Sequence, residues 1–223
     1  MIIERQLIQG NGFYIPSIIL TPSNSISTAV IVHGYGGCKE EQPGLAWRIA
    51  EIGIKTCVID LRGHGENELP FDENVILDVK TAIEYCRPFG KVVAIGHSLG
   101  GRLSLLSDAD YIIGLSPAFN KTFSIQTQET IKALRGYRVQ EVYPNILFKT
   151  LSNLPEWQFD ESSNIDIIVG SRDVPEIIST SNELKGKGVS VTQIDKALHN
   201  DIFLLEITFE KIINLLKEWF CMP

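Results

Sequence analysis

Short apolar runs rich in β-branched residues recur throughout this chain, and segments with a helical period separate them. The runs are FYIPSIIL from residue 13, STAVIVH from 27, KTCVID from 55, KVVAIG from 91, YIIGLS from 111, IDIIVG from 165 and VSVTQI from 189. Each run has the length and composition of a β-strand. Strands that alternate with helices predict an α/β fold.

The apolar pattern within the runs also indicates how the sheet is covered. From the third run onward the apolar residues are nearly continuous, as expected when helices bury both faces of a parallel sheet. The two runs on either side of Gly10-Asn11-Gly12 instead predict an antiparallel hairpin at one edge. We therefore expect an eight-stranded, mostly parallel sheet flanked by helices.

Composition and charge limit the classes of protein and partner. The chain has 223 residues, of which 44 % are hydrophobic and 21 % charged, as in a globular protein with one core. The net charge of −7 disfavours nucleic acid as a partner. No secretory signal and no apolar run of the ~20 residues that cross a bilayer are visible. We expect a cytoplasmic protein without a membrane span, and the sequence predicts no oligomeric state.

The cysteines give no sign of a structural or metal-binding framework. Cys38, Cys57, Cys86 and Cys221 are widely separated, and no C-x-x-C pair occurs. This spacing favours reduced thiols over disulfides or a zinc site. We therefore expect no metal site.

Residues 119–160 depart from the regular alternation of strands and helices. Seven of the chain's 19 aromatic residues lie in this segment. One interpretation is an extra helical excursion whose aromatic side chains fill a small core of their own. The segment follows the end of a predicted strand, where binding sites of α/β folds lie, so we favour a lid. The predicted organisation is one domain over residues 1–223, with a lid or cap insertion at about 119–160.

The stretch AIGHSLGGRLS, residues 94–104, contains a serine between two glycines. A strand ends here and a helix begins, which places Ser98 at a sharp turn with a strained backbone. Gly96 and Gly100 remove side chains that would collide as strand and helix approach each other. The start of the helix directs backbone N–H groups, above all that of Leu99, toward the reacting centre as oxyanion donors. The G-x-S-x-G pattern also occurs in ordinary glycine-rich loops, so it does not establish catalysis alone.

Other motifs lie at the ends of other predicted strands. They are HGYGG from His33, DLRGHGE from Asp60, GHSLGG from Gly96 and GSRDVPE from Gly170, and His199 follows them. Together they resemble the α/β-hydrolase family over nearly the whole chain. The resemblance implies a nucleophile, an acid and a histidine in that order, which are Ser98, Asp173 and His199 here. It also implies the Tyr35 amide as the second oxyanion donor.

General chemistry supports the same histidine. A serine hydroxyl is a poor nucleophile near neutral pH and needs an adjacent base. His33, His64 and His97 stand beside glycines in loops, where hydrogen bonding or packing explains them. His199 follows the last predicted strand, so we predict that it is the base, against the alternative of a surface or helix-capping histidine.

The acid has competitors in the sequence. Asp195 and Asp201 flank His199, but residues so close along the chain do not usually reach back to its Nδ1. Asp173 leaves a separate strand end and is the predicted acid. Some family members place the acid after strand six, where this chain has Asn120 in LSPAFN.

The remaining motif residues invite structural interpretations and one rival function. We expect DLRGHGEN to shape a loop, with Asp60 and Arg62 in an ion pair; Glu66 stands where the family often has serine. Strand, glycine loop, helix, strand and acid is also the order of a dinucleotide site. That fingerprint fails here because Lys39 occupies the third glycine position, and Glu40 and Glu41 would repel a pyrophosphate.

The predicted function is that of a serine hydrolase that cleaves a carboxylic ester through an acyl-serine intermediate, without a metal or organic cofactor. Acyl transfer, thioester or peptide cleavage with the same triad, and a non-catalytic binding module on this fold, remain alternatives. The expected partner is a small acyl substrate with an apolar or aromatic group.

The sequence does not decide the roles of four basic side chains near these motifs. Lys132, Arg135 and Arg138 would attract a carboxylate-bearing substrate, but a solvated helix face explains them more simply. Arg102 follows the elbow closely, and the sequence does not decide whether it faces the cleft.

Overall fold

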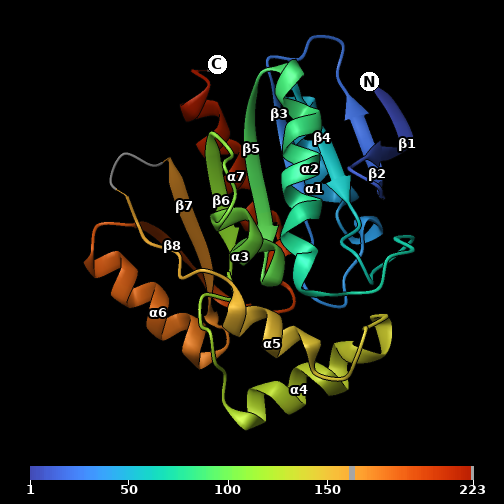
Figure 1. The fold of residues 1–223 in the computed structure, drawn as a ribbon. Coiled ribbons are helices and arrows are strands. Elements are labelled where there is room, and N and C mark those ends of the chain that lie inside the picture. The colour runs from blue at the N-terminus through green and yellow to red at the C-terminus, as the bar shows by residue number, and fades with distance from the viewer. Residues whose placement is uncertain (161–163, 222–223) are drawn as a thin grey trace.

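The computed structural model describes residues 1–160 and 164–221. Within these residues, eight strands form one sheet in the order β1-β2-β4-β3-β5-β6-β7-β8 (Figure 1). The strands are β1 Ile2–Gln9, β2 Tyr14–Thr21, β3 Ser27–Val32, β4 Ile54–Ile59, β5 Lys91–His97, β6 Tyr111–Leu115, β7 Ile165–Arg172 and β8 Ser190–Leu198.

The pairing of the strands confirms the predicted sheet. β1 pairs with β2, and β2 with β4, in antiparallel register. All the neighbouring pairs from β4 to β8 are parallel. The hairpin between β1 and β2 closes at Gly10, whose N–H donates to the carbonyl of Phe13 at 2.8 Å. Because the strands from β3 onward run in one direction, their carboxyl ends meet at one edge of the sheet.

Helices cover both faces, as the continuous apolar pattern predicts. The α-helices of the described residues are α1 Pro43–Glu51, α2 Ile76–Cys86, α3 Leu99–Leu105, α4 Ile125–Arg135, α5 Ile146–Asn153, α6 Pro175–Gly186 and α7 Glu206–Trp219. Short 3-10 turns are η1 Lys39–Glu41, η2 Glu73–Val75, η3 Arg87–Phe89, η4 Gly136–Arg138 and η5 Ile202–Leu204. None of the helices in this part of the chain is long and apolar enough to cross a membrane.

Two apolar clusters on opposite faces hold these layers together. One cluster joins side chains of α2 and α3 to the sheet, and the other joins α1 and α7 to the opposite face. In α1, Pro43 occupies the first turn, where its missing N–H costs nothing, and Leu45 and Ile49 are fully buried one turn apart. Each such side chain contributes roughly 1.5–3 kcal/mol by leaving water. The burial of both faces fixes the strand ends relative to one another.

The segment 119–160 contributes α4 and α5, which lie beyond the carboxyl ends of the parallel strands (Figure 1). Its aromatic residues do not act as one group. Phe119, Trp157 and Phe159 pack against one another and against a cluster that includes β6 and β7 side chains. Phe123 is buried in a different cluster, while Tyr137 is 82 % exposed. Several of these aromatic residues therefore attach the segment to the clusters that pack on the sheet.

Candidate active site

Ser98 lies in the turn between β5 and α3. β5 ends at His97 and α3 begins at Leu99, so a single residue joins them. Ser98 has φ 52° and ψ −112°, a strained conformation for a side chain other than glycine. A Cβ on Gly96 would lie 2.2 Å from the Gly100 carbonyl oxygen, and a Cβ on Gly100 would lie 2.4 Å from the Val32 carbonyl oxygen, so both positions require glycine. The turn holds the Ser98 side chain at the wall of a pocket.

The structure brings Ser98, His199 and Asp173 together from the ends of three strands. The Ser98 hydroxyl lies 3.0 Å from Nε2 of His199, and Nδ1 of His199 lies 2.7 Å from Oδ1 of Asp173. An ionised carboxylate can only accept, so Nδ1 carries the proton and Nε2 accepts from the serine. The Asp173 side chain is fully buried, whereas that of His199 is 18 % exposed. The chain of hydrogen bonds therefore runs from the interior to the pocket.

Four donors surround the Asp173 carboxylate, one of them the Gly170 N–H, which lies 3.4 Å from Oδ2. Besides His199, the Val174 N–H donates to Oδ1 at 2.7 Å, and the Ser116 hydroxyl donates to Oδ2. Burial opposes the charged form, but the hydrogen bonds from His199 and Ser116 outweigh it and hold the pKa of Asp173 below its ordinary value. Sequence analysis did not single out Ser116, which follows β6 with φ 46°. Its place between a strand end and Pro117 is the only sequence signal for it.

The competing carboxylates lie elsewhere. The Asp195 side chain is 82 % exposed and accepts a 3.4 Å hydrogen bond from Ser171. Asp201 accepts from the Leu198 N–H at 2.7 Å and so holds the turn after β8. Asn120 contacts Thr180 at 3.4 Å. Of the candidate acids, Asp173 alone is hydrogen-bonded to His199 among the described residues.

The predicted oxyanion donors line the same pocket as Ser98. Leu99 is the first residue of α3, where a helix leaves its N–H groups without internal partners. Tyr35 follows β3, and its hydroxyl donates to Glu141 at 2.7 Å. Within residues 1–160 and 164–221, neither backbone amide donates to another protein group. Both amides remain available to an acceptor in the pocket.

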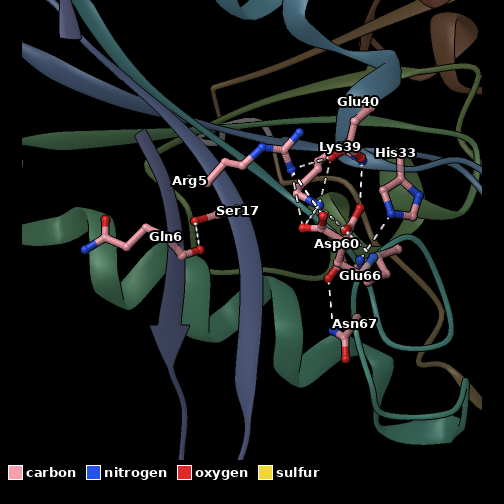
Figure 2. Close-up of polar contacts among 10 residues, drawn as sticks. Arg5, Gln6, Ser17, His33, Lys39, Glu40, Asp60, Glu66 and Asn67 are labelled. Atoms are coloured by element: carbon pink, nitrogen blue, oxygen red, sulfur yellow. Dashed lines mark hydrogen bonds and ion pairs between the residues drawn. The ribbon is translucent and has the colours of Figure 1, made fainter. Parts of the chain in front are cut away.

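A buried ionic network supports the loop that follows β3. Lys39 is fully buried, and its Nζ donates to Asp60 Oδ2 at 2.6 Å and to Glu66 Oε2 at 2.8 Å (Figure 2). The Lys39 N–H donates to the other Asp60 oxygen at 2.7 Å. Burial alone would lower the lysine pKa, but the hydrogen bonds from Nζ to Asp60, Glu66 and Glu40 raise the pKa to about 12. Arg5 of β1 adds a 2.9 Å bond to Glu40 at the surface (Figure 2).

The expected ion pair between Asp60 and Arg62 is wrong. Arg62 instead donates to Asp78 of α2 at 2.8 Å and to Asp72 at 2.7 Å. The reason is that β4 ends at Ile59, so the two residues do not share the face of a strand. Asp60 turns toward the loop after β3, and Arg62 turns toward α2.

The other three histidines hold loops, as expected. The Leu61 N–H donates to His33 Nε2 at 3.1 Å, and His64 Nδ1 donates to the Arg62 carbonyl at 2.8 Å. His97 Nε2 donates to the His199 carbonyl at 2.8 Å, a support for the histidine loop that sequence analysis missed. Burial lowers the pKa of His33 to about 4 and those of His64 and His97 to about 3. All three are neutral near pH 7.

The pocket beside Ser98 is formed jointly by the sheet edge and by α4 and α5. Its walls are mainly apolar, and Phe123, Ile131, Leu147 and Leu151 come from the segment 119–160. Charged side chains in the wall are Glu41 and Arg135. Arg102 is buried and donates to the Pro155 carbonyl, so it anchors the end of that segment and does not face the pocket.

Comparisons with known proteins agree with this architecture. Residues 29–163, more than half of the chain, match the model of the Alpha/beta hydrolase family. The structure resembles an esterase of Pyrobaculum calidifontis, with a TM-score of 0.71 at 19 % identity over 96 % of this chain and 84 % of that one. At this identity the likeness shows the fold.

Two curated relatives match the chain more locally. The uncharacterized protein YfhR of Salmonella typhi is 32 % identical over 111 residues, which are 47 % of this chain and 37 % of that protein. Ethanol acetyltransferase 1 of Eremothecium cymbalariae is 32 % identical over 94 residues, 40 % of this chain and 26 % of that protein. The matched segments thus cover little more than a third of these relatives' length at most. From the extent of the family match and the shared fold, we conclude that this chain belongs to the alpha/beta hydrolase family.

Proposed function

We propose that this protein is a serine hydrolase that cleaves a carboxylic ester through an acyl-serine intermediate. The observation that carries the proposal is the continuous hydrogen-bonded chain of Ser98, His199 and Asp173, with distances of 3.0 Å and 2.7 Å, at the wall of an apolar pocket. A hydroxyl in contact with a neutral imidazole that a buried carboxylate orients is the arrangement that activates serine.

In the first half of the reaction, Ser98 Oγ attacks the ester carbonyl and its proton moves to Nε2 of His199. The carbonyl oxygen becomes an oxyanion, which the Leu99 and Tyr35 amides stabilise. When the intermediate collapses, the carbon–oxygen bond to the leaving alcohol breaks and His199 returns the proton to that oxygen. The acyl group is then bonded to Ser98.

In the second half, water replaces the alcohol. His199 removes a proton from the water as its oxygen attacks the acyl carbonyl, and the same amides receive the oxyanion. Collapse breaks the bond to Ser98 Oγ, which takes the proton back from His199. Asp173 stays ionised throughout, keeps the proton of the ring on Nδ1 and stabilises the imidazolium.

The same proposal assigns residues 119–160 the role of a lid on one domain. α4 and α5 supply much of the apolar wall opposite Ser98. An apolar wall suits an apolar acyl or aryl group and excludes water around the reacting carbonyl.

Acyl transfer is a second candidate, which the matches to ethanol acetyltransferase 1 favour. The first half of the reaction is the same, but an alcohol rather than water attacks the acyl-serine and gives a new ester. Product analysis in the presence of a competing alcohol separates the two, since hydrolysis gives the free acid and transfer gives the second ester.

Intact mass after exposure to a fluorophosphonate tests the nucleophile without knowledge of the substrate. We expect a single adduct on the wild type, none on Ser98→Ala, and an unchanged adduct on Ser179→Ala, which removes an exposed hydroxyl from α6. Ester turnover should fall by about 10⁴-fold or more in Ser98→Ala. An adduct that persists in Ser98→Ala, or none on the folded wild type, would contradict the proposal.

A further inference from the structure

Arg135 stands where the lid meets the loop that carries Tyr35. It is the last residue of α4 and is half-buried. Gly36 has φ +72°, and a Cβ there would lie 2.6 Å from Cβ of Arg135. The end of α4 thus rests directly on the loop beside the proposed oxyanion donor.

Arg135 contributes to the walls of two neighbouring cavities. Arg135 lines the pocket that contains Ser98 and also the groove that runs between α4 and the start of α6. The two cavities share the residues Thr127, Ile131, Arg135, Val174, His199 and Asn200. Arg135 therefore lies at the junction of the apolar pocket and the outer groove, both of which His199 also lines.

Arg135 differs from its basic neighbours Lys132 and Arg138 in lining the pocket. Arg138 forms an ion pair with Glu41 at 2.7 Å, and the Lys132 ammonium lies over the Phe148 ring at 5.6 Å from its centre. Among residues 1–160 and 164–221, no carboxylate lies within ion-pair distance of Arg135. Its charge nevertheless acts inside the site, since it adds to the much larger effect of burial in lowering the pKa of His97.

The acidic side chains around these cavities already have partners. Glu41 lines the pocket but is neutralised by Arg138. Glu176 lines the groove, where its carboxylate accepts from the Ser124 N–H at 3.1 Å and from the Thr127 hydroxyl at 3.2 Å. What remains is an unpaired guanidinium beside apolar walls.

We infer that Arg135 binds a carboxylate of the substrate, so that the esters turned over are anionic, with an apolar part in the pocket and the carboxylate at its entrance. A guanidinium in a half-buried, mostly apolar setting binds a carboxylate through two parallel charge-assisted hydrogen bonds. This inference rests on the proposed function, because it assigns a substrate class to the same site. For Arg135 alone, it favours the alternative of a carboxylate-bearing substrate over that of a solvated helix face.

The first experiment compares esters that differ only in charge. One series is the mono(4-nitrophenyl) esters of adipic, pimelic and suberic acids against the same esters with an amide in place of the carboxylate. A second pair places the charge on the alcohol side: the butanoyl esters of 4-hydroxybenzoate and 4-hydroxybenzamide. We expect the wild type to prefer the charged member by about 10-fold or more in kcat/KM in at least one pair.

The variants decide whether Arg135 causes this preference. In Arg135→Gln the ratio of charged to neutral kcat/KM should fall to near 1, and Arg135→Lys should retain part of it. Lys132→Gln is the matched control, because it removes one positive charge from the same helix outside the pocket, and the ratio should not change. An undiminished ratio in Arg135→Gln, or a preference of the wild type for every neutral member, would overturn the inference while leaving ester hydrolysis intact.

A binding measurement separates this inference from the proposed function. Ser98→Ala cannot form the acyl-serine, so calorimetry can measure Kd for the intact charged and neutral esters. The charged ester should bind about 10-fold more tightly, and addition of Arg135→Gln should abolish the difference. Equal Kd values, or no binding of any charged ester, would overturn the role of Arg135 whether or not the wild type hydrolyses esters.

Discussion

The carboxyl edge of the sheet and the helices of the proposed lid form one pocket together. They differ in whether their charged side chains have polar partners. At the sheet edge, the buried side chains of Lys39, Asp60 and Asp173 each have at least two polar partners. On the proposed lid, Arg138 forms a half-exposed pair, whereas Arg135 has no ion-pair partner among the residues that the structure describes. A buried charge without a partner is costly, so the interior must satisfy its own groups. A half-exposed charge is still partly hydrated, so it can remain without a protein partner at a lower free-energy cost until a ligand binds.

The two regions also differ in how they are packed. The strands and the helices that cover them are held by large apolar clusters, whereas α4 contains no fully buried residue. A segment with few buried apolar contacts opens at a lower free-energy cost than the core. This difference is consistent with the two proposals above, in which the sheet edge fixes the reacting groups and residues 119–160 act as a lid that contacts the substrate.

The largest effect is expected for Asp173→Asn, which tests whether the buried carboxylate at the sheet edge orients His199. The amide changes the hydrogen-bond pattern at Nδ1 of His199 and cannot stabilise the imidazolium, so kcat should fall by about 10⁴-fold while the fold persists. Steady-state kinetics and circular dichroism would measure the two effects. Asp195→Asn, the same isosteric change at an exposed carboxylate, should retain near wild-type turnover. Loss of turnover in Asp195→Asn instead of Asp173→Asn would move the acid to another residue.

Lys39→Met tests whether the paired charges of the sheet edge are held as tightly as their burial indicates. Methionine has a similar volume but leaves the buried charge of Asp60 without its ammonium, so the free energy of unfolding should fall by about 3–5 kcal/mol. Urea denaturation measures the loss. Ester turnover should fall as well, because Lys39 anchors the loop that carries Tyr35.

Two further variants complete that experiment. Lys39→Met/Asp60→Asn should regain part of the stability, because the amide oxygen can still accept from a backbone N–H without an unpaired charge. Arg138→Gln breaks the half-exposed pair on the lid and should cost at most about 1 kcal/mol. Equal losses in Lys39→Met and Arg138→Gln would abolish the contrast between the two regions.

Acid should weaken the sheet edge before it affects the lid, since three buried histidines belong to the former and residues 119–160 contain none. Burial lowers the pKa values of His33, His64 and His97 in the folded chain to about 3–4. The unfolded chain binds protons first as the pH falls below about 6.5, so stability present above that pH is lost toward pH 4. Between these pKa values, each histidine lowers the free energy of unfolding by about 1.4 kcal/mol for every unit by which the pH falls.

Urea denaturation at pH 7, 6 and 5 measures this slope. His64→Asn should reduce the slope by about the share of one histidine. A stability that stays constant from pH 7 to pH 5 would show that these rings are protonated in the folded chain.

Much of the fold could be predicted because its signals are local. Helix α1 shows its buried face at Leu45 and Ile49, and most of the strand runs are largely apolar. Helix α4 could not be predicted in the same way, because it buries no residue completely and so carries no clear apolar face. Its position depends on contacts such as that between Arg135 and Gly36, which are distant in the sequence.

The residues of the candidate site also fall into those that the sequence could indicate and those that it could not. Ser98, Asp173 and His199 could be proposed because each follows a recognisable strand, and strand ends of a parallel sheet converge. The partner of Asp60 could not be assigned correctly, because proximity in the sequence favoured Arg62. In the folded chain, Asp60 instead pairs with Lys39, which lies in the loop after β3. The contact of Ser116 with Asp173 could not be predicted either, because it joins the ends of two strands that are far apart in the sequence.

The sequence by itself therefore determined the alternation of strands and helices and the strained turn at Ser98, because propensity, apolar period and glycine positions act over a few residues. The order of the proposed triad came from the resemblance of its motifs to the family. Tertiary structure alone decided which charges pair in the interior, that Arg102 anchors the end of residues 119–160, and that Arg135 lines the pocket without an ion-pair partner in the described part of the chain. These outcomes depend on hydrogen-bond distances between side chains that lie far apart along the chain. Such distances are set only when the sheet and its helices pack together.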